Sequence, residues 1–261
     1  METVWITGAS SGIGEACAYL WAEGGARLII TAPTADELAP VAAKCREKGA
    51  PDVAVLPYDL AHPDGIPALV QAAWEAFGSI DTTYLNAGIS QRTSVEDTSM
   101  EMLRTLMEID YFAPAAIAKE LLPRMEAQGG GHIAVTTSIA GRFDFRLRCG
   151  YCSAKHALYG FFETLQAESY DKGIRVTLVC PGRVRTNISL RALDKGGLPH
   201  GKMDPGQAGG IPVEKAARTI VKAVRKGRRE VLVGSKELIM VYIKRFFPGL
   251  CARLARKLKP V

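Results

Sequence analysis

The sequence predicts a single α/β domain over 1–261, in which a doubly wound parallel sheet carries helices on both of its faces. Short segments rich in β-branched and apolar residues alternate along the chain with longer segments of helical character. No repeat or linker interrupts this alternation. Such a pattern produces right-handed crossovers and a parallel sheet. A length of 261 residues is sufficient for one such domain with a sizeable core.

The expected strands lie at 3–7, 27–31, 53–57, 81–85, 132–136, 174–179 and 230–233. The expected helices lie at 15–23, 36–48, 65–77, 101–127, 151–170 and 213–226. The fourth helix is expected to kink or break at Pro114, because proline lacks the N–H of an intrahelical hydrogen bond. The segment 187–212 is rich in glycine and has little periodicity, so we expect it to form a lid over the substrate.

The first strand runs directly into a glycine-rich turn, GASSGIG at 8–14, and then into a helix. In this context a glycine pattern indicates dinucleotide binding, because glycines let backbone N–H groups approach a pyrophosphate at the helix N-terminus. A plain strand-to-helix turn is the alternative, which the context disfavours. The expected architecture is therefore a Rossmann fold.

Polar residues follow the ends of other expected strands, where a cofactor crevice is expected. Asp59 and Leu60 follow the third strand, and Asn86-Ala87-Gly88 follows the fourth. Turn capping alone is the alternative for Asp59 or Asn86, and it is less convincing for both together.

The end of the second strand indicates the choice between NADP and NAD. The chain has Thr31, Ala32, Pro33 and Thr34 there, with neither an acidic residue nor an arginine. An acidic residue would bind the ribose of NAD, and an arginine would bind the 2′-phosphate of NADP. Because no carboxylate would repel a 2′-phosphate, we expect NADP(H), with NAD(H) as the alternative.

Tyr151 and Lys155 stand four positions apart, with Ser138 upstream. Residues at this spacing share one helix face, so the ammonium of Lys155 is expected beside the Tyr151 ring. A tyrosine pKa of ~10 is too high for acid/base work near neutral pH. A cation about 5 Å away, at an effective dielectric constant of ~20, lowers it by ~2 units. The three residues are therefore a candidate acid/base site.

Together these motifs resemble the short-chain dehydrogenase/reductase family. The chain matches the TGxxxGxG pattern at 7–14, the NAG motif at 86–88, the Tyr-x3-Lys pair with its upstream serine, and a PG…T motif ending at Thr186. The tail and 187–210 also resemble the subgroup that contains the DHRS7-type reductases.

The resemblance implies hydride transfer between a nicotinamide cofactor and a carbonyl or secondary alcohol substrate, which we expect to be lipophilic. It implies that Tyr151 exchanges the proton, that Ser138 bonds the substrate oxygen, and that Lys155 lowers the tyrosine pKa and binds the ribose. It also implies a homodimer or homotetramer. The predicted catalytic residues are Ser138, Tyr151, Lys155 and Asp110. The predicted cofactor-binding residues are Gly8, Ser10, Ser11, Gly12, Ile13, Gly14, Thr31, Thr34, Asp59, Leu60, Asn86, Ala87, Gly88, Tyr151, Lys155, Pro181, Gly182, Val184 and Thr186.

One position departs from the family pattern. The family usually has an asparagine in the central helix that holds a proton-relay water, and this chain has Asp110. An ionised Asp110 near Lys155 would partly cancel the effect of that cation on Tyr151. The alternative is that Asp110 is simply a tolerated polar replacement.

Three alternatives remain open: an anionic substrate, a redox role for two cysteines, and a binding protein without catalytic activity. Arg142, Arg146 and Arg148, just before Tyr151, could meet an acidic or phosphorylated substrate, as in a 3-oxoacyl-thioester reductase, or could be solvated. A C-x-x-C at Cys149 and Cys152 could be a redox switch, although coincidence explains it much better, because the family resemblance accounts for Tyr151 without the cysteines. The other class is a dinucleotide-binding scaffold or sensor without turnover. We expect no metal site, because no histidine has partners at ligand spacing.

Composition narrows the cellular setting. The net charge of +6 is concentrated in 222–229 and in the tail, so nucleic-acid binding is not expected. Six scattered cysteines, no apolar run of ~20 residues and a first strand close to Met1 lead us to expect a cytoplasmic protein without a signal peptide. The tail, 236–261, mixes apolar and basic residues. It could pack on the body, form a subunit contact, or rest on an anionic membrane.

Overall fold

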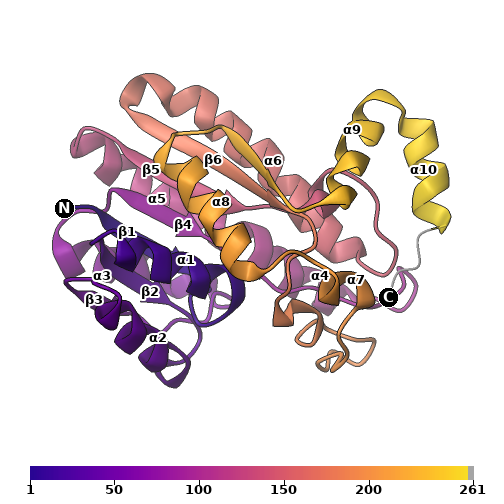
Figure 1. Ribbon diagram of the computed structural model, residues 1–261, viewed down its shortest axis with the longest axis horizontal. Coiled ribbons are helices and arrows are strands. Elements are labelled where there is room, and N and C mark those ends of the chain that lie inside the picture. Colours follow the sequence, from indigo (N-terminus) through magenta and orange to yellow (C-terminus); the bar gives the residue numbers. More distant parts are fainter. Residues whose placement is uncertain (258–261) are drawn as a thin grey trace.

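The computed structural model describes residues 1–257 and contains one parallel sheet of seven strands (Figure 1). This confirms the α/β, doubly wound Rossmann architecture expected from the sequence. In spatial order the strands are β3 (Val53–Val55), β2 (Arg27–Thr31), β1 (Thr3–Thr7), β4 (Thr82–Leu85), β5 (Gly131–Thr136), β6 (Ile174–Pro181) and β7 (Glu230–Val233).

Both faces of the sheet are apolar, because alternate residues of each strand point to opposite sides. Val4 and Ile6 of β1 pack in one core cluster, whereas Trp5 between them packs in the other. Helices α1 (Gly12–Glu23), α2 (Ala35–Glu47) and α8 (Val213–Arg225) cover the first face. Helices α3 (Ile66–Phe77), α5 (Ala113–Ala127) and α6 (Cys149–Ser169) cover the second.

The strand register brings the sequence motifs together. Thr7, the last residue of β1, pairs with Thr31 of β2 on one side and with Leu85 of β4 on the other. The segments that begin at Gly8, Ala32 and Asn86 therefore leave the sheet side by side. This placement follows from parallel pairing, in which carboxyl ends share one edge.

The expected long helix of 101–127 is divided by a single wide turn. Helix α4 (Met100–Met107) passes into a π turn, Glu108–Phe112, and then into α5. Pro114 lies in the first turn of α5, directly after the π turn, where its missing N–H is tolerated. The π turn carries the buried Asp110.

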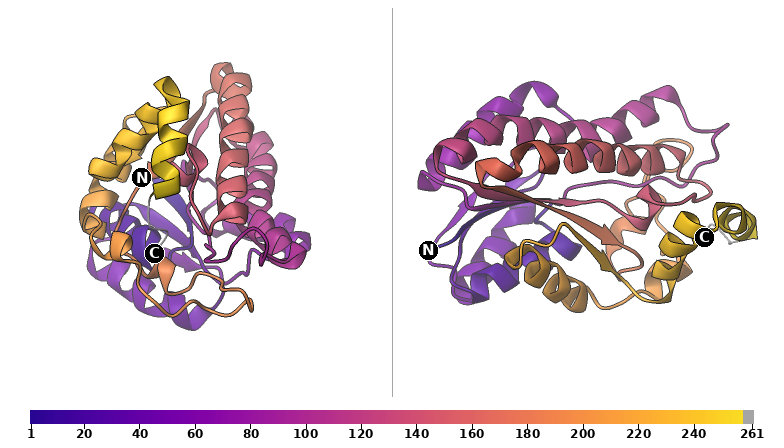
Figure 2. Two further views of the ribbon diagram at one scale, coloured as in Figure 1. Left: turned by 90° about the vertical axis from the view of Figure 1, so that its right-hand side faces the viewer. Right: turned by 90° about the horizontal axis from the view of Figure 1, so that it is seen from above.

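The remaining elements gather beyond the carboxyl ends of the strands (Figure 1). The segment 187–212 holds a short helix, α7 (Pro205–Ala208), and the chain ends in α9 (Ile239–Phe246) and α10 (Pro248–Lys257), which project from the body (Figure 2). Residues 258–261 of the predicted tail lie outside the described part. Within 1–257, none of the helices has the length and apolarity needed to cross a membrane. Short 3-10 turns occupy Pro63–Gly65, Ile139–Gly141, Tyr170–Lys172, Asn187–Ser189 and Lys236–Leu238.

Candidate active site

Two adjoining cavities lie at the carboxyl edge of the sheet. The first, of about 300 Å³, is lined by the glycine turn and the ends of β2 and β4, and we call it the glycine cavity. The second, of about 510 Å³, is lined by Ser138, the PG…T segment and the 204–207 part of the predicted lid, and we call it the lid cavity. Tyr151 and Thr186 line both. The two spaces therefore meet at the predicted acid/base residue.

The turn at 8–14 leaves no room for a side chain at Gly8 or Gly14. Gly8 has φ +64°, and a Cβ there would lie 2.7 Å from the Cα of Ala87. A Cβ on Gly14 would lie 2.2 Å from the carbonyl oxygen of Gly8. Ser11 precedes α1 without a side-chain capping hydrogen bond, so the N–H groups of the first turn remain for an anion. The cradle fits the pyrophosphate of a dinucleotide.

Asn86 connects the ends of three strands. Its Nδ2 donates to the carbonyl oxygen of Gly8 at 3.3 Å, and its Oδ1 accepts from Thr136 Oγ1 at 3.1 Å. Its backbone N–H donates to Thr7 Oγ1 at 3.0 Å. Asn86 thus holds the glycine turn against the neighbouring strand, beyond the simple turn capping considered from sequence.

Ser138, Tyr151 and Lys155 come together as expected. Tyr151 and Lys155 lie on α6, and the Lys155 Nζ is 5.6 Å from the centroid of the Tyr151 ring. The same Nζ donates to the carbonyl oxygen of Thr136 at 3.1 Å. Ser138 caps the 3-10 turn that follows β5 and hydrogen-bonds the Tyr151 phenol. The three side chains therefore form one cluster at the junction of the cavities.

Asp110 lies behind this cluster, completely buried in the π turn. One carboxylate oxygen accepts from the Ile89 N–H at 2.7 Å, and the other is 3.5 Å from Lys155 Nζ. Burial raises the pKa of Asp110, while Lys155 and the Ile89 N–H act in the opposite direction. Asp110 lines neither cavity, and it contacts the cluster through Lys155.

The pKa of the Tyr151 phenol is raised, which differs from the expected lowering by Lys155. Burial is the main cause and the Asp110 carboxylate the next, whereas the hydrogen bond with Ser138 lowers the pKa. Burial therefore outweighs the lowering expected from Lys155, and the Asp110 carboxylate adds to the rise. An asparagine at 110 would not have this effect.

Gln91, which the sequence analysis did not single out, holds the start of α6. Its Oε1 accepts from the N–H groups of Gly150 and Tyr151, at 2.7 and 3.1 Å. Its Nε2 donates to Thr93 and Thr98. The side chain is fully buried, so it fixes the backbone that carries the tyrosine. Nothing in its local spacing marks it, because it bonds residues about 60 positions away.

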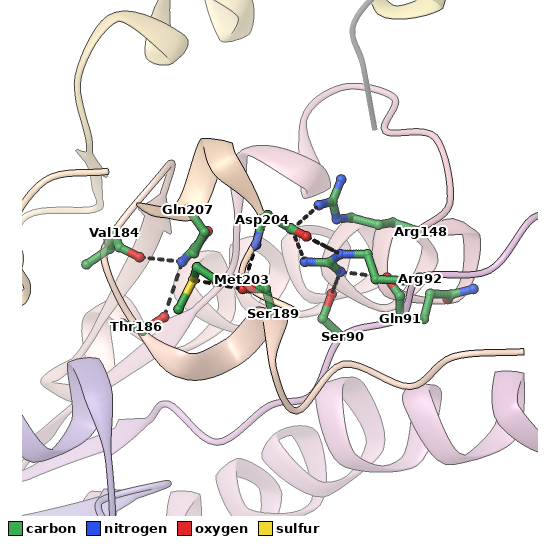
Figure 3. Close-up of polar contacts among 10 residues, drawn as sticks. All are labelled: Ser90, Gln91, Arg92, Arg148, Val184, Thr186, Ser189, Met203, Asp204 and Gln207. Atoms are coloured by element: carbon green, nitrogen blue, oxygen red, sulfur yellow. Dashed lines mark hydrogen bonds and ion pairs between the residues drawn. The ribbon is translucent and has the colours of Figure 1, made fainter. Parts of the chain in front are cut away.

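A buried ion cluster ties the predicted lid to the body (Figure 3). Arg92 donates from Nε to Asp204 Oδ2 at 3.0 Å, and Arg148 donates from Nη2 to the same oxygen at 2.9 Å. Arg92 and Asp204 are both buried. The sequence analysis identified Arg148 as a candidate for contact with an acidic substrate, but here its partner is a carboxylate of the chain itself.

The same segment also holds the PG…T motif (Figure 3). Gln207 Nε2 donates to Thr186 Oγ1 at 3.2 Å and to the carbonyl oxygen of Val184. The backbone of the segment bonds the 90–92 loop, with Leu193 donating to Ser90 at 2.8 Å. Residues 187–212 therefore form an ordered wall of the lid cavity, and their role as a substrate lid stays a prediction.

Most predicted site residues line one of the two cavities, and three do not. Gly14 lies beneath the glycine turn, Thr34 caps α2 by accepting from the Glu37 N–H at 3.4 Å, and Asp110 lies behind Lys155. The glycine cavity is lined by the predicted residues Gly8, Ser10, Ser11, Gly12, Ile13, Thr31, Asp59, Leu60, Asn86, Ala87, Gly88, Tyr151, Lys155 and Thr186. The lid cavity is lined by the predicted residues Ile13, Ser138, Tyr151, Pro181, Gly182, Val184 and Thr186.

The two cysteines beside Tyr151 have ordinary structural surroundings. Cys149 Sγ lies 3.4 Å from Thr98 Oγ1, and burial raises the pKa of Cys152 to about 11. A thiol with a raised pKa is a poor nucleophile, so the structure gives no support to the redox switch. Within residues 1–257, no three His, Cys, Asp or Glu side chains are grouped as metal ligands would be.

The sequence as a whole matches a known family. The family described as short chain dehydrogenase matches residues 2–195. The chain belongs to the short-chain dehydrogenase family. It is 35% identical over 257 residues to "Dehydrogenase/reductase SDR family member 7B" of Bos taurus, covering 96% of this chain and 79% of that protein. It is also 35% identical to "Dehydrogenase/reductase SDR family protein 7-like" of Drosophila melanogaster, over 95% of this chain and 78% of the relative. Both the family and the resemblance to the DHRS7-type subgroup are thus confirmed.

Solved structures agree on the fold. An alcohol dehydrogenase from Thermococcus sibiricus, complexed with 5-hydroxy-NADP, superimposes with a TM-score of 0.77 at 27% identity, covering 90% of this chain and 97% of the other. A short-chain dehydrogenase/reductase from Burkholderia phymatum in complex with NAD has a TM-score of 0.84 at 23% identity, covering 100% and 96% of the two chains. The protein is therefore a short-chain dehydrogenase/reductase, an oxidoreductase that uses a nicotinamide cofactor.

Proposed function

We propose that this enzyme is an NADP(H)-dependent reductase of lipophilic carbonyl compounds, which also oxidises the corresponding secondary alcohols. The observation that carries the proposal is that Tyr151 and Ser138 line the lid cavity, while Tyr151 and Lys155 line the glycine cavity. A substrate in the lid cavity thus meets a cofactor in the glycine cavity at the proton-carrying phenol.

A nicotinamide cofactor, held by the glycine turn, Asn86 and Lys155, would supply the hydride chemistry between the carbonyl compound and its alcohol. Ser138 donates a hydrogen bond to the substrate oxygen, and Tyr151 delivers the proton to that oxygen during reduction. Lys155 lies beside the Tyr151 ring, with its Nζ 5.6 Å from the ring centroid, and Asp110 holds the lysine in place. The 187–212 wall excludes water from the reacting atoms.

The test is a panel of ketones, aldehydes and secondary alcohols run with NADPH and NADH, or with their oxidised forms for the alcohols. We expect turnover of apolar carbonyl compounds by the wild-type protein. Tyr151→Phe removes the proton carrier and should reduce kcat by roughly 100- to 10,000-fold, while cofactor affinity, measured by nucleotide fluorescence, stays within about twofold. Cofactor binding without turnover of any compound by the wild-type protein would contradict the proposal.

Arg191 supports the choice of NADP(H). It comes from the predicted lid, yet it lines the glycine cavity together with Thr31, Ala32 and Pro33, the end of β2. In dinucleotide-binding folds, an arginine near this end of β2 binds the 2′-phosphate of NADP. A guanidinium can donate two parallel hydrogen bonds to a phosphate, which an ammonium group cannot do. In the structure the guanidinium of Arg191 pairs with the carboxylate of Glu37, and its Nη2 lies 3.8 Å from Glu37 Oε1. Arg191 is far from β2 along the chain, so the residues that follow this strand give no sign of it.

Arg191→Ala tests this choice. We expect the kcat/KM for NADPH to fall by about tenfold or more, because a charge-assisted contact is lost, while the value for NADH stays nearly unchanged. Arg185→Ala is the matched control, since Arg185 is also exposed but lines neither cavity. Equal losses with both cofactors would show that Arg191 does not read the phosphate.

A second candidate is reduction of a carbonyl compound that carries an anionic group, such as a 3-oxoacyl thioester. Arg146 and Arg183 are exposed and line the lid cavity, which supports this candidate. Arg142 does not, because it pairs with Glu230 at 2.8 Å and stacks on the Tyr159 ring. The lipophilic proposal rests instead on the apolar lining residues Ile139, Ala140, Phe145, Val184 and Ile188.

Substitution of Arg146 separates these two candidates. If the substrate is anionic, Arg146→Ala should raise its KM by about tenfold, and leave the KM of a neutral ketone unchanged. If both KM values are unchanged, the result supports a neutral lipophilic substrate.

We also propose that the protein forms a dimer or tetramer. Light scattering on the same samples measures this oligomeric state.

A further inference from the structure

The C-terminal hairpin, residues 236–257, has an apolar face that nothing in the described chain covers. Large apolar side chains are exposed at twelve positions of residues 1–257, and five of these lie within 239–250. They are Ile239, Tyr242, Phe246, Phe247 and Leu250, and we call them the outer face. Such a concentration of exposed apolar surface marks an interaction site.

The outer face arises from the helix period and the turn. Ile239, Tyr242 and Phe246 occupy positions i, i+3 and i+7 of α9 and therefore share one side. Phe247 and Leu250 lie at and just after the turn into α10, where Phe246 and Phe247 are about two-thirds exposed, at 65% and 62%. The hairpin tip is thus a pair of exposed phenyl rings.

The opposite side of the hairpin is fixed to the body. Met240, Val241 and Cys251 pack with Phe143 and Ile139 in a small core cluster. Lys244 pairs with Asp144 at 3.4 Å. The outer face is therefore held outward by packing, on a hairpin that extends from one end of the body in the right-hand view of Figure 2.

Charge identifies the partner. Residues 236–257 contain six Lys and Arg residues and one acidic residue, Glu237, which gives a net charge of +5 against +6 for the whole chain. Exposed cations flank the phenyl rings on both sides, with Arg245 before them and Arg253 and Arg256 after them. Apolar rings at the tip between cations suit a bilayer surface that carries negative headgroups.

A second copy of the chain fits this face less well. In a two-fold interface the same patch meets itself, so the basic residues of one hairpin would face those of the other. Like charges brought together in this way oppose association. We therefore propose that the outer face of the C-terminal hairpin binds the surface of an anionic membrane, with Phe246 and Phe247 inserted.

The position of the hairpin relates this contact to the site. Ala255 of α10 lines the lid cavity, together with Asp144 and Phe145, which lie under the hairpin. Membrane binding by the outer face would thus bring the cavity wall close to the bilayer. The binding itself does not depend on the proposed reaction, and its test needs no turnover.

The test is co-sedimentation with vesicles of phosphatidylcholine alone and of phosphatidylcholine with 30 mol% phosphatidylserine. We expect the wild-type protein to pellet with the anionic vesicles, at least tenfold more tightly than with the neutral ones, and to be released by 0.5 M NaCl. Phe246→Ser with Phe247→Ser should weaken binding by about tenfold or more. Arg253→Glu with Arg256→Glu should do the same on anionic vesicles only.

Two matched controls isolate the hairpin. Val95→Ser removes an exposed apolar side chain elsewhere, and Lys215→Glu with Lys222→Glu makes the same charge change on α8. Both should bind as the wild type does. Cofactor fluorescence verifies that each variant is folded. The proposal is overturned if the wild type fails to pellet, if the Phe246 and Phe247 variant binds unchanged, or if light scattering shows that this variant dissociates an oligomer, since a second copy would then cover the outer face.

Discussion

The glycine cavity and the lid cavity adjoin each other, yet they are built in different ways. The glycine cavity is made of short motifs that follow neighbouring strands, and the backbone itself forms much of its wall. The lid cavity is closed by side chains from distant segments, such as Arg92 and Asp204, which are 112 positions apart. The glycine turn that lines the glycine cavity has almost no space for an added atom. The wall of the lid cavity depends instead on buried charge pairing. The following substitutions test this difference, from the largest expected effect to the smallest.

Asp204→Ala should have the largest effect on stability. It leaves the guanidinium of Arg92 buried without its carboxylate partner, and breaking a buried pair in this way costs roughly 3–5 kcal/mol of the free energy of unfolding. Urea denaturation measures the loss. Hydrogen exchange should also show faster exchange in 187–212, which the cluster ties to the 90–92 loop.

The control for Asp204 is an exposed ion pair from the same segment. Lys195 lies 2.8 Å from Asp97, and both side chains are exposed. Lys195→Ala should leave the midpoint of unfolding nearly unchanged, because exposed pairs contribute little. If both substitutions had the same effect, buried charge pairing would not be what holds the lid cavity.

Gly14→Ala tests the glycine cavity. Its Cβ would lie 2.2 Å from the Gly8 carbonyl oxygen and 2.7 Å from Asn86 Nδ2, so the turn must shift. We expect a loss of roughly 1–3 kcal/mol in the free energy of unfolding and a tenfold or greater loss of nucleotide affinity. Gly160→Ala on α6 is the control, since a Cβ there meets nothing within 4 Å, and it should stabilise the protein by up to about 1 kcal/mol.

Asp110→Asn should change the pH dependence of alcohol oxidation more than its maximal rate. The carboxylate raises the pKa of Tyr151, so its removal lowers that pKa. Alcohol oxidation needs the deprotonated Tyr151 phenol. The rate of oxidation therefore increases as the pH rises past the pKa of Tyr151. The rising limb of the pH–rate profile should therefore move to lower pH, by about one unit.

The control for Asp110 is Glu108→Gln, which makes the same chemical change on the same π turn. Burial and Asp64 raise the pKa of Glu108, and Glu108 is not among the causes of the Tyr151 shift. Its profile should match the wild type. A profile that does not move in Asp110→Asn would mean that Lys155 alone governs the phenol.

Much of the glycine cavity could be predicted from sequence because its residues are local. Gly8, Asn86 and Tyr151 each lie in a motif whose spacing follows from a strand end or a helix turn, and parallel pairing places those motifs side by side. Gln91, Arg191 and Asp204 could not be found in this way. Each acts on a partner far along the chain, and nothing in its neighbouring residues indicates which partner that is.

The sequence by itself determined the α/β fold class, the order of the strands and helices, and which residues we propose for acid/base chemistry, since periodicity and short-range spacing encode these directly. It also placed a carboxylate at 110. Only the tertiary structure decided the direction of the Tyr151 pKa shift, because burial and the 3.5 Å approach of Asp110 to Lys155 depend on how the π turn packs against α6. The same holds for the outer face of the hairpin, where packing selects which apolar residues are covered and which face outward.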